Sequence, residues 1–402
     1  MRTRRSILQA TSSSIALAST GLLGRLAWAD LPRGTLESGI LEALPGKQPL
    51  LKRSFRPPNY ETPVGFFNDV ITPNDRFFVR WHLANIPRIE ASSWRLDIGG
   101  DAAVRSFDLS LDQLRNDFEP VEVAAVCQCS GNRRGLSDPH VPGVEWGYGA
   151  MGNARWKGAR LKDILTRAGL KKETIEIAFN GADRGPIDAT PGFVKSIPVW
   201  RAMDESTLVA YEMNGAPLPH WNGFPARIVV PGWTATYWMK QVASLRALSQ
   251  ALVGFWMNTA YRIPKGKFPV VDRFLSQETE TTTPITEMVV NSLITNVTDG
   301  QHFPANKPVV VSGVAWDGGY GIRRVDVSVD EGRTWGTADL GTDLGRYSFR
   351  PWQFAFNPRA QGRISVMARA SNALGTTQTL ELIFNAPGYH NNAVQKIALD
   401  IG

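Results

Sequence analysis

The chain has 402 residues, with 44 Lys and Arg against 37 Asp and Glu and a formal net charge of +7 at pH 7. This length predicts two or three domains, and the thirteen tryptophans provide material for large hydrophobic cores. Four arginines and no acid lie in residues 1–29, so the net charge falls from +7 to +3 without that segment. Beyond it there is no basic run interleaved with aromatic residues and no apolar run approaching about twenty residues. Neither nucleic-acid binding nor a membrane span is therefore expected.

Residues 1–29 have the composition of an export signal, with a basic start, a short apolar run and small residues at the end. The paired Arg4 and Arg5 make the segment similar to a twin-arginine signal, which is an address and not an anchor. Cleavage after Ala29 would leave a periplasmic protein that begins at Asp30. A disordered basic tail is the alternative interpretation of the same residues.

The next part of the chain predicts a mixture of strands, loops and short helices. Residues 30–75 are rich in Pro and Gly and predict an irregular segment that wraps around the rest. Ser110 and Gln113 form a capping box that opens a helix to about residue 116, and a second helix should stop at Gly169. That second helix is expected at 161–168, and strands are expected at 76–82, 94–99, 121–126 and 174–179.

The composition changes at the polar stretch 276–284, which predicts a linker. After it, short alternating strands are expected at 309–316, 324–329, 363–370 and 377–383. This spacing predicts an immunoglobulin-like β-sandwich. The expected fold class is therefore α+β, with a mixed α/β domain at 30–275 followed by an all-β domain at 276–402.

Both cysteines of the chain lie in one short stretch, Val126 to Gly135. Cys127 and Cys129 are one residue apart, and a disulfide between them would close a strained ring. The paired Arg133 and Arg134 follow, so a soft sulfur ligand stands beside fixed positive charge, which suits a metal or a nucleophile near an anion. The sequence contains no Cys-x-x-Cys-His, so no c-type haem is expected in this chain, and no zinc-finger spacing occurs.

The segment Cys129-Ser-Gly-Asn-Arg-Arg134 resembles the molybdenum-ligand motif of the sulfite oxidase family, Cys-(Ala/Ser)-Gly-Asn-Arg-Arg. Phe78-Val-Arg-Trp-His82 is similar to the family's Phe-Val-Arg-Asn-His. The stretches 211–219 and 223–232 resemble its central block, and 325–335 resembles its C-terminal dimerisation domain. The similarity covers about residues 70–400 in the family's order.

The resemblance implies a molybdenum–molybdopterin cofactor and the oxidation of sulfite to sulfate by oxygen-atom transfer. Within the family the chain is similar to the bacterial exported sulfite dehydrogenases, which pass electrons to a c-type cytochrome. The expected partners are sulfite and that cytochrome, including a tightly bound haem subunit, in a homodimer or a heterodimer. Two alternatives are an enzyme like the periplasmic methionine sulfoxide reductase, which lacks the C-terminal sandwich, and a non-catalytic exported binding protein.

The resemblance also assigns roles to individual residues. Cys129 would supply the thiolate to molybdenum, whereas Cys127 is expected to be a small core residue. Arg133 is expected to be structural. The sulfite pocket would be formed by Arg80, Arg134, Trp146 and Tyr261.

The pterin and its phosphate would contact His82, Asp183, Asn222, Arg227, Trp238, Met239 and Lys240. Asn222 departs from the animal enzymes, which have His at this position, and His220 is the alternative contact. Lys396 stands near the place of a pocket arginine of the family, and no role is assigned to it.

Overall fold

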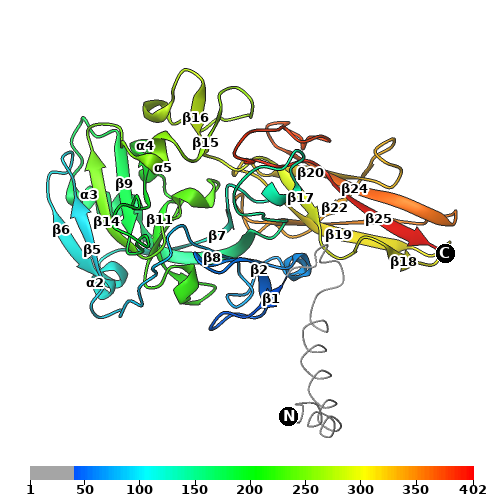
Figure 1. Cartoon of the computed structure of the whole chain (residues 1–402), viewed down its shortest axis with the longest axis horizontal. Coiled ribbons are helices and arrows are strands. Elements are labelled where there is room, and N and C mark those ends of the chain that lie inside the picture. Colours follow the sequence, from blue (N-terminus) through cyan, green and yellow to red (C-terminus); the bar gives the residue numbers. More distant parts are fainter. Residues whose placement is uncertain (1–39) are drawn as a thin grey trace, which may run out of the picture.

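The computed structural model describes residues 40–402. The predicted signal segment 1–29 lies outside these residues. Figure 1 shows the described chain as two masses side by side, with the β-strands of residues 291–401 forming one of them. The described chain is mostly β, and no helix in it is long and apolar enough to cross a membrane.

A small antiparallel sheet begins the described chain where an irregular segment was predicted. Its strands, in the order β1-β2-β3-β4, span Leu41–Glu42, Leu50–Ser54, Asn59–Glu61 and Val79–Arg80, and η1 spans Val64–Asn68. The prediction missed β1 to β3 because strands of two to five residues are too short to show an alternating pattern. Strand β4 lies within the strand predicted at 76–82. The sheet is held by buried Leu50, Tyr60, Val79 and Trp81. Its last strand carries Arg80.

A second sheet has the order β10-β9-β14-β5-β6, with one parallel pair, β14 and β5. Its strands are β5 (Arg95–Gly99), β6 (Phe107–Ser110), β9 (Glu176–Gly181), β10 (Val194–Pro198) and β14 (Val242–Leu248). The helices of this part are α2 (Leu111–Asn116), α3 (Leu161–Ala168), α4 (Val199–Ala202) and α5 (Phe255–Asn258).

Two helices confirm predictions made from local sequence. The Gln113 amide donates to Ser110 Oγ over 3.1 Å, and the Ser110 amide donates to Gln113 Oε1 over 2.9 Å, which completes the capping box of α2. Helix α3 stops at Gly169, whose φ of 70° lies in the left-handed region that glycine tolerates. Both signals act within one turn of the chain and need no distant partner.

A third sheet, in the order β12-β11-β8-β7 with β13 also on β11, leads to the cysteines. Its strands are β7 (Pro120–Gln128), β8 (Met151–Arg160), β11 (Leu208–Met213), β12 (Ala216–Pro217) and β13 (Arg227–Val229). The 3₁₀ turns η2 (Arg134–Leu136), η3 (His220–Asn222) and η4 (Ala235–Tyr237) lie in its connections. Strand β7 contains Cys127 and ends one residue before Cys129.

The stretch predicted to be a linker is fixed to the rest of the fold. Strand β16 (Thr282–Pro284) pairs with β15 (Arg262–Pro264), and the preceding turn η5 (Leu275–Gln277) buries Gln277. The Gln277 side chain donates to Glu176 Oε1 over 3.0 Å and to Leu252 O over 3.0 Å. Polar composition predicted a linker here, but strand pairing and the buried Gln277 attach the stretch to the rest of the fold, although Ser276 and residues 279–281 are exposed.

The C-terminal part consists of two sheets that share one core. The first has the order β17-β19-β23-β22, and the second has the order β18-β25-β24-β20-β21. Both sheets contribute to a cluster that includes Val311, Trp352, Val325, Val366 and Leu399, so the sheets form a sandwich. The strands are β17 (Asn291–Ile294), β18 (Gln301–Phe303), β19 (Val309–Trp316), β20 (Ile322–Ser328), β21 (Gly336–Thr337), β22 (Asp339–Leu340), β23 (Arg350–Phe356), β24 (Gly362–Asn372) and β25 (Gln395–Ile401).

The strand predicted at 377–383 does not form, and the last strand of the chain is β25 instead. Leu380 is half exposed, whereas Gln378 is buried and receives hydrogen bonds from Ser292 Oγ (2.6 Å) and the Ala370 amide (2.8 Å). Leu380 therefore does not face the core, and Ile383 packs against it only in part. The polar residue of the pattern is the buried one because it satisfies neighbouring backbone and side-chain groups.

The two masses are joined along β7 and the loop that follows it. Val126 and Met151 pack with Leu293, Val314 and Trp316 of the sandwich. The guanidinium of buried Arg133 donates to the carbonyls of Ser292 (2.8 Å) and Ala393 (2.9 Å). Arg133 thus has the structural position predicted for it, and it anchors the cysteine loop to the C-terminal part.

Replacing Arg133 with Met should lower the free energy of unfolding by about 3 kcal/mol, since a hydrogen bond to a charged group contributes about 1.5–3 kcal/mol. Two backbone carbonyls would also be left buried without a donor. Urea denaturation followed by tryptophan fluorescence measures the change, with the exposed Arg323→Met as the matched control. A loss no larger than that of the control would contradict the anchoring role.

Candidate functional site

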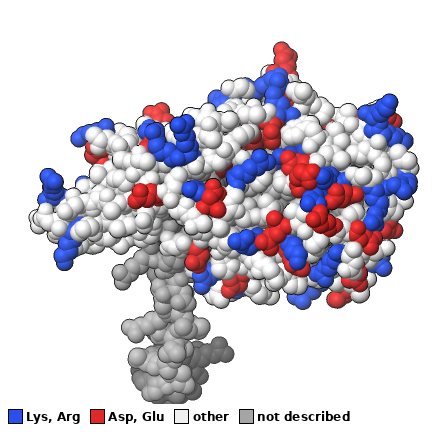
Figure 2. All heavy atoms as spheres, turned by 180° about the vertical axis from the view of Figure 1, so that it is seen from behind, with Lys and Arg blue, Asp and Glu red and all other residues white. Residues whose placement is uncertain are grey.

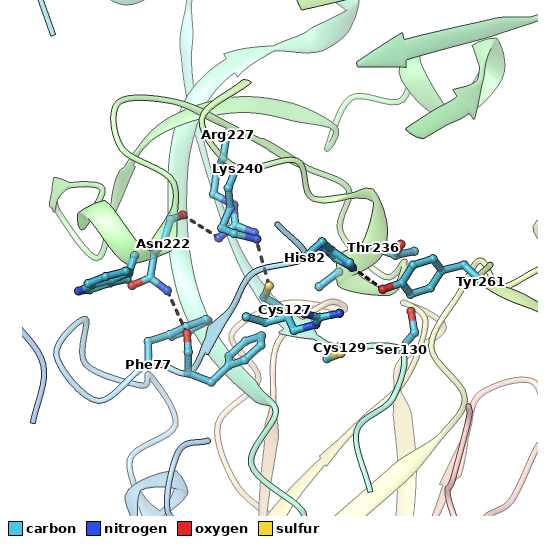
Figure 3. Close-up of a pocket in the computed structure, with 14 residues that line it drawn as sticks. Phe77, His82, Cys127, Cys129, Ser130, Asn222, Arg227, Thr236, Lys240 and Tyr261 are labelled. Carbon is cyan, nitrogen blue, oxygen red and sulfur yellow. Dashed lines mark hydrogen bonds between the residues drawn. The ribbon is translucent and has the colours of Figure 1, made fainter. Parts of the chain in front are cut away.

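A pocket of about 430 Å³ lies where the ends of β4 and β7, the turns η3 and η4, and the segment around Tyr261 meet. Fourteen residues line it (Figure 3). They come from sequence positions 77–82, 127–130, 221–240 and 261. Of the predicted site residues, the lining includes Arg80, His82, Cys129, Asn222, Arg227, Lys240 and Tyr261.

The loop after β7 presents Cys129 to the pocket. The Cys129 amide donates to Ala150 O over 2.9 Å, and the Ala150 amide donates to Asn132 Oδ1 over 2.9 Å. A Cβ at Gly131 would come within 2.6 Å of the Arg134 guanidinium, so a larger residue there would displace that side chain. These contacts hold the cysteine side chain in place through the backbone, independently of any ligand.

Cys127 also reaches the pocket. It is buried, as predicted, but it lines the cavity beside Cys129 instead of lying only in the core. Arg227 Nη2 donates to its sulfur over 3.7 Å (Figure 3). Burial raises the pKa of the Cys127 thiol, and the nearby cations Arg227 and Lys240 oppose that rise only in part.

Arg80, His82 and Tyr261 form a contiguous group on one wall. The Tyr261 hydroxyl is hydrogen-bonded to His82 Nε2, and Arg80 Nη1 donates to Asn59 Oδ1 over 3.1 Å. Burial, together with the cations Arg80 and Lys240, holds the pKa of His82 well below its usual value, so its imidazole is neutral. Burial alone would lower the pKa of Arg80, but Tyr261 and Cys129 beside it raise it above the ordinary value.

Tyr261 has a φ of 60°, in the left-handed region that a residue with a side chain rarely adopts. Its ring stacks on Tyr389 of the C-terminal part, with centroids 5.6 Å apart and planes 5° from parallel. Burial raises the pKa of the Tyr261 hydroxyl. Backbone strain at a buried, polar side chain is typical of a functional position.

The opposite wall is built by Asn222, Arg227 and Lys240. Arg227 donates to the carbonyls of Asn222 (3.0 Å) and Trp238 (3.2 Å), and Lys240 lies 4.6 Å from the centre of the Trp81 ring. Burial lowers the pKa of Lys240 to about 7, and Arg227 adds to the effect. This wall therefore carries the buried guanidinium of Arg227 and the half-buried side chain of Lys240.

The two ends of the Asn222 side chain are engaged by the protein. Its Oδ1 accepts from Lys47 Nζ over 2.6 Å, and its Nδ2 donates to Phe78 O over 3.2 Å. Lys47 also donates to Phe77 O over 3.0 Å. Asn222 thus fixes the wall, and His220, its alternative, lies outside the lining residues.

Five predicted site residues do not line the pocket: Arg134, Trp146, Asp183, Trp238 and Met239. Arg134 is next to it, since it lies 5.3 Å from the ring of Tyr389 and donates to Pro387 O over 2.9 Å.

The other four residues of that group are buried behind the walls. Asp183 is a neighbour of Lys240, and burial raises the pKa of its carboxyl group. Trp238 donates to Trp233 O over 3.0 Å. Lys396 is exposed on β25, away from the site.

Several residues of the site and its surroundings were not predicted, among them Lys47, Ser130, Lys195, Thr236 and Tyr389. Ser130 lies within the cysteine motif, and Thr236 is close to Trp238-Met-Lys240. Closeness to a motif is therefore the sequence signal that indicates both residues. Lys47, Lys195 and Tyr389 stand in stretches without a motif. No local pattern distinguishes a buried lysine from a solvated one.

The pocket is strongly cationic. Arg80, Arg227 and Lys240 line it, and the fourteen lining residues include no Asp or Glu. By contrast, Lys and Arg are interspersed with Asp and Glu on the molecular face in Figure 2. Positive charge in a pocket whose lining offers no carboxylate favours an anionic ligand.

Several buried polar atoms around the pocket have no partner in the protein. Ser130 Oγ, Thr236 Oγ1 and the Nε atoms of Arg80 and Arg227 make no hydrogen bond. Trp146 Nε1 is also buried without a hydrogen-bond partner. Within residues 40–402, no group of three or more His, Cys, Asp or Glu could hold a metal ion.

Comparison with known proteins first defines the class. Residues 82–256 match the family profile described as an oxidoreductase molybdopterin binding domain, and residues 282–401 match the Mo-co oxidoreductase dimerisation domain. The crystal structure of the sulfane dehydrogenase SoxCD from Paracoccus pantotrophus superposes with a TM-score of 0.74 at 24% identity. The superposition covers 98% of this chain and 95% of that one, so the two share a fold.

The curated relatives then define the family. The chain is 37% identical over 369 residues to mitochondrial sulfite oxidase of Macaca fascicularis, covering 88% of this chain and 66% of the relative. It is 36% identical over 340 residues to sulfite oxidase of Gallus gallus, covering 81% and 72%. For sulfite oxidase of Arabidopsis thaliana the identity is 28% over 383 residues, covering 89% and 96%. The chain belongs to the sulfite oxidase family of molybdopterin enzymes, and it spans about two thirds of the length of the mammalian relatives.

The buried Lys47 generates a pH prediction. Burial lowers its pKa from 10.5 to about 7, so between these values the unfolded chain binds a proton that the folded chain does not. Its contribution to stability is therefore complete above 10.5 and is lost as the pH falls to 7. Lys47→Met should make the rise of unfolding free energy with pH shallower by up to about 1.4 kcal/mol per pH unit.

Urea denaturation at about pH 7.5 and about pH 9 checks this slope. The exposed Lys307→Met serves as the control and should follow the unsubstituted protein at both values. Identical pH dependence in Lys47→Met and the unsubstituted protein would show that Lys47 is charged in the fold.

Proposed function

We propose that this protein binds a molybdenum–pterin cofactor in the pocket and oxidises sulfite to sulfate. The observation that supports this most directly is the composition of the lining, which joins Cys129 to Arg80, Arg227, Lys240 and Tyr261 from four separated segments. A thiol next to convergent cations suits a soft metal that carries an anionic ligand. Sulfite oxidases of animals and plants are among the relatives of the chain.

The residues present fit the cofactor. Ser130 Oγ, Thr236 Oγ1 and Arg227 Nε are buried polar atoms without a partner, and a group rich in oxygen and nitrogen would satisfy them. Lys240 and Arg227 would bind the cofactor's phosphate, and Cys129 would hold molybdenum through its thiolate. When bound, the cofactor would supply the oxygen-atom transfer and accept the two electrons.

The chain's own residues would place the substrate. Arg80 offers a fixed, permanently charged donor for the sulfite oxygens, and Tyr261 offers a hydroxyl from the same wall. Because His82 is held neutral, its hydrogen bond to Tyr261 orients the hydroxyl without adding another charge. Trp146 and Arg134, close behind this wall, complete the proposed surroundings of the anion.

The proposal includes export by the twin-arginine route and electron transfer to a c-type cytochrome in the periplasm. It is supported by the Arg4-Arg5 pair, by the composition of residues 1–29 and by the similarity to exported sulfite dehydrogenases. The dimerisation-domain match supports association, either with a second copy or with a cytochrome subunit. Sulfite-dependent reduction of a c-type cytochrome by protein purified from the periplasm tests both parts. Failure to reduce it would contradict the proposed acceptor.

Cys129→Ser should abolish any thiolate-to-metal absorption and reduce sulfite oxidation by more than about a hundredfold, beyond the effect typical of an outer partner of a metal site. A serine hydroxyl ionises far less readily than a thiol and is a poor substitute for the ligand. Cys127→Ser is the matched control, since it changes the neighbouring cysteine of the same pocket. If both variants retain the absorption, Cys129 is not the ligand.

Arg80→Met should raise the KM for sulfite about ten- to a hundredfold, because charge-assisted hydrogen bonds of about 1.5–3 kcal/mol would be lost. Steady-state kinetics with an artificial electron acceptor measures KM separately from the acceptor step. The exposed Arg359→Met should behave like the unsubstituted protein. An unchanged KM in Arg80→Met would remove Arg80 from the substrate pocket.

A further inference from the structure

Lys195, on β10, is a fully buried lysine close to the site but outside the lining residues. Its Nζ donates to Trp256 O over 2.7 Å. Among the described residues it forms no ion pair. Glu176, an acid whose charge acts on it, receives hydrogen bonds from Ser196 and Ser276, each over 2.6 Å.

The ammonium group of Lys195 faces the aromatic residues that hold the substrate wall. It lies 5.2 Å from the centre of the Tyr261 ring and 4.8 Å from that of Tyr237. The Trp256 segment that it anchors packs the indole edge-on against His82, with ring centroids 5.4 Å apart. Lys195 therefore contacts one partner of the His82–Tyr261 hydrogen bond directly and supports the other through Trp256.

A second cation acts on the same aromatic stack. Tyr389 lies parallel to Tyr261, and the Arg134 guanidinium is 5.3 Å from the Tyr389 ring centre. Each of the two stacked rings thus contacts one cation: Tyr261 contacts Lys195, and Tyr389 contacts Arg134. Rings in such contact attract positive charge through their electron-rich faces.

Burial of the Lys195 ammonium group by itself lowers the stability of the folded protein. Burial lowers the pKa of Lys195 to about 7, and repulsion from Arg262 contributes to the shift. The surroundings therefore disfavour the charged form of Lys195. An apolar side chain of the same length would fill this space without the desolvation penalty. A buried cation with one backbone hydrogen bond and an active-site tyrosine beneath it is therefore a candidate for a role in the site.

We propose that Lys195 is a positioning residue that polarises Tyr261 from behind and holds the Trp256 segment against His82. When the Tyr261 hydroxyl donates a hydrogen bond, negative charge builds up on its oxygen. A positive charge near the ring stabilises that charge, so Tyr261 becomes a stronger donor to an oxyanion. This inference rests on the proposed function for the identity of the oxyanion. Its geometry does not depend on that identity.

The test separates the charge of Lys195 from its size and its hydrogen bond. Lys195→Met removes the charge, Lys195→Gln removes the charge but keeps a donor for Trp256 O, and Lys195→Arg keeps the charge. The exposed Lys172→Met is the control. Two quantities are measured on cofactor-loaded protein: the affinity for sulfate, from quenching of tryptophan fluorescence, and the kcat and KM for sulfite.

Lys195→Met and Lys195→Gln should weaken sulfate binding and raise KM about tenfold, with kcat changing much less, whereas Lys195→Arg and Lys172→Met should stay within about threefold. A purely structural lysine would change stability without this split between KM and kcat. If Lys195→Met does not fold, Lys195→Gln carries the same comparison. Sulfate affinity that is equal in the charged and uncharged variants would overturn the inference.

The outcome also distinguishes this inference from the proposed function. An unsubstituted protein that binds sulfate but does not oxidise sulfite would contradict the function, while the affinities would still test Lys195. An active unsubstituted protein with unchanged Lys195→Met and Lys195→Gln variants would contradict only the role of Lys195.

Discussion

The cysteine loop is held from two sides by hydrogen bonds that cross the junction between the two masses of the protein. Arg133 donates to Ser292 O and Ala393 O, and the Val126 amide donates to Tyr347 O. Because these acceptors lie more than 150 residues further along the chain, the position of Cys129 depends on the folded C-terminal sandwich. The sandwich is therefore part of the site's framework. Tyr389, which stacks on Tyr261, is its most direct contribution.

Positive charge is the second constraint on the site. Lys47, Lys195 and Lys240 are each buried enough for their pKa to fall to about 7. When these lysines are protonated, they make with Arg80 and Arg227 a region that is costly to assemble without anions. An anionic cofactor and an anionic substrate would offset this cost, so the binding free energy of both depends on charge that the fold has already brought together. In the proposed reaction, these groups would already be in place before the ligand binds.

Local signals predicted part of the fold well. The capping box of α2, Gly169 after α3 and strand β19 agree with the prediction because each depends on neighbours in the sequence. The short strands β1 to β3 were missed because two to five residues do not establish a period, whereas β4 lies within the strand predicted at 76–82. The strand expected at 377–383 failed for a different reason, since buried polar contacts of Gln378 decide which face of that segment points inward.

By itself, the sequence determined the cysteine motif, the family it resembles and the residue types that could serve a metal and an anion. These are properties of order and spacing along the chain. Only the tertiary structure decided that Cys127 joins Cys129 in the pocket, that Lys47 donates a hydrogen bond to Asn222, and that Lys195 contacts the ring of Tyr261. Those relations depend on burial and on contacts between distant segments, because only chain folding brings such segments within a few ångströms of each other.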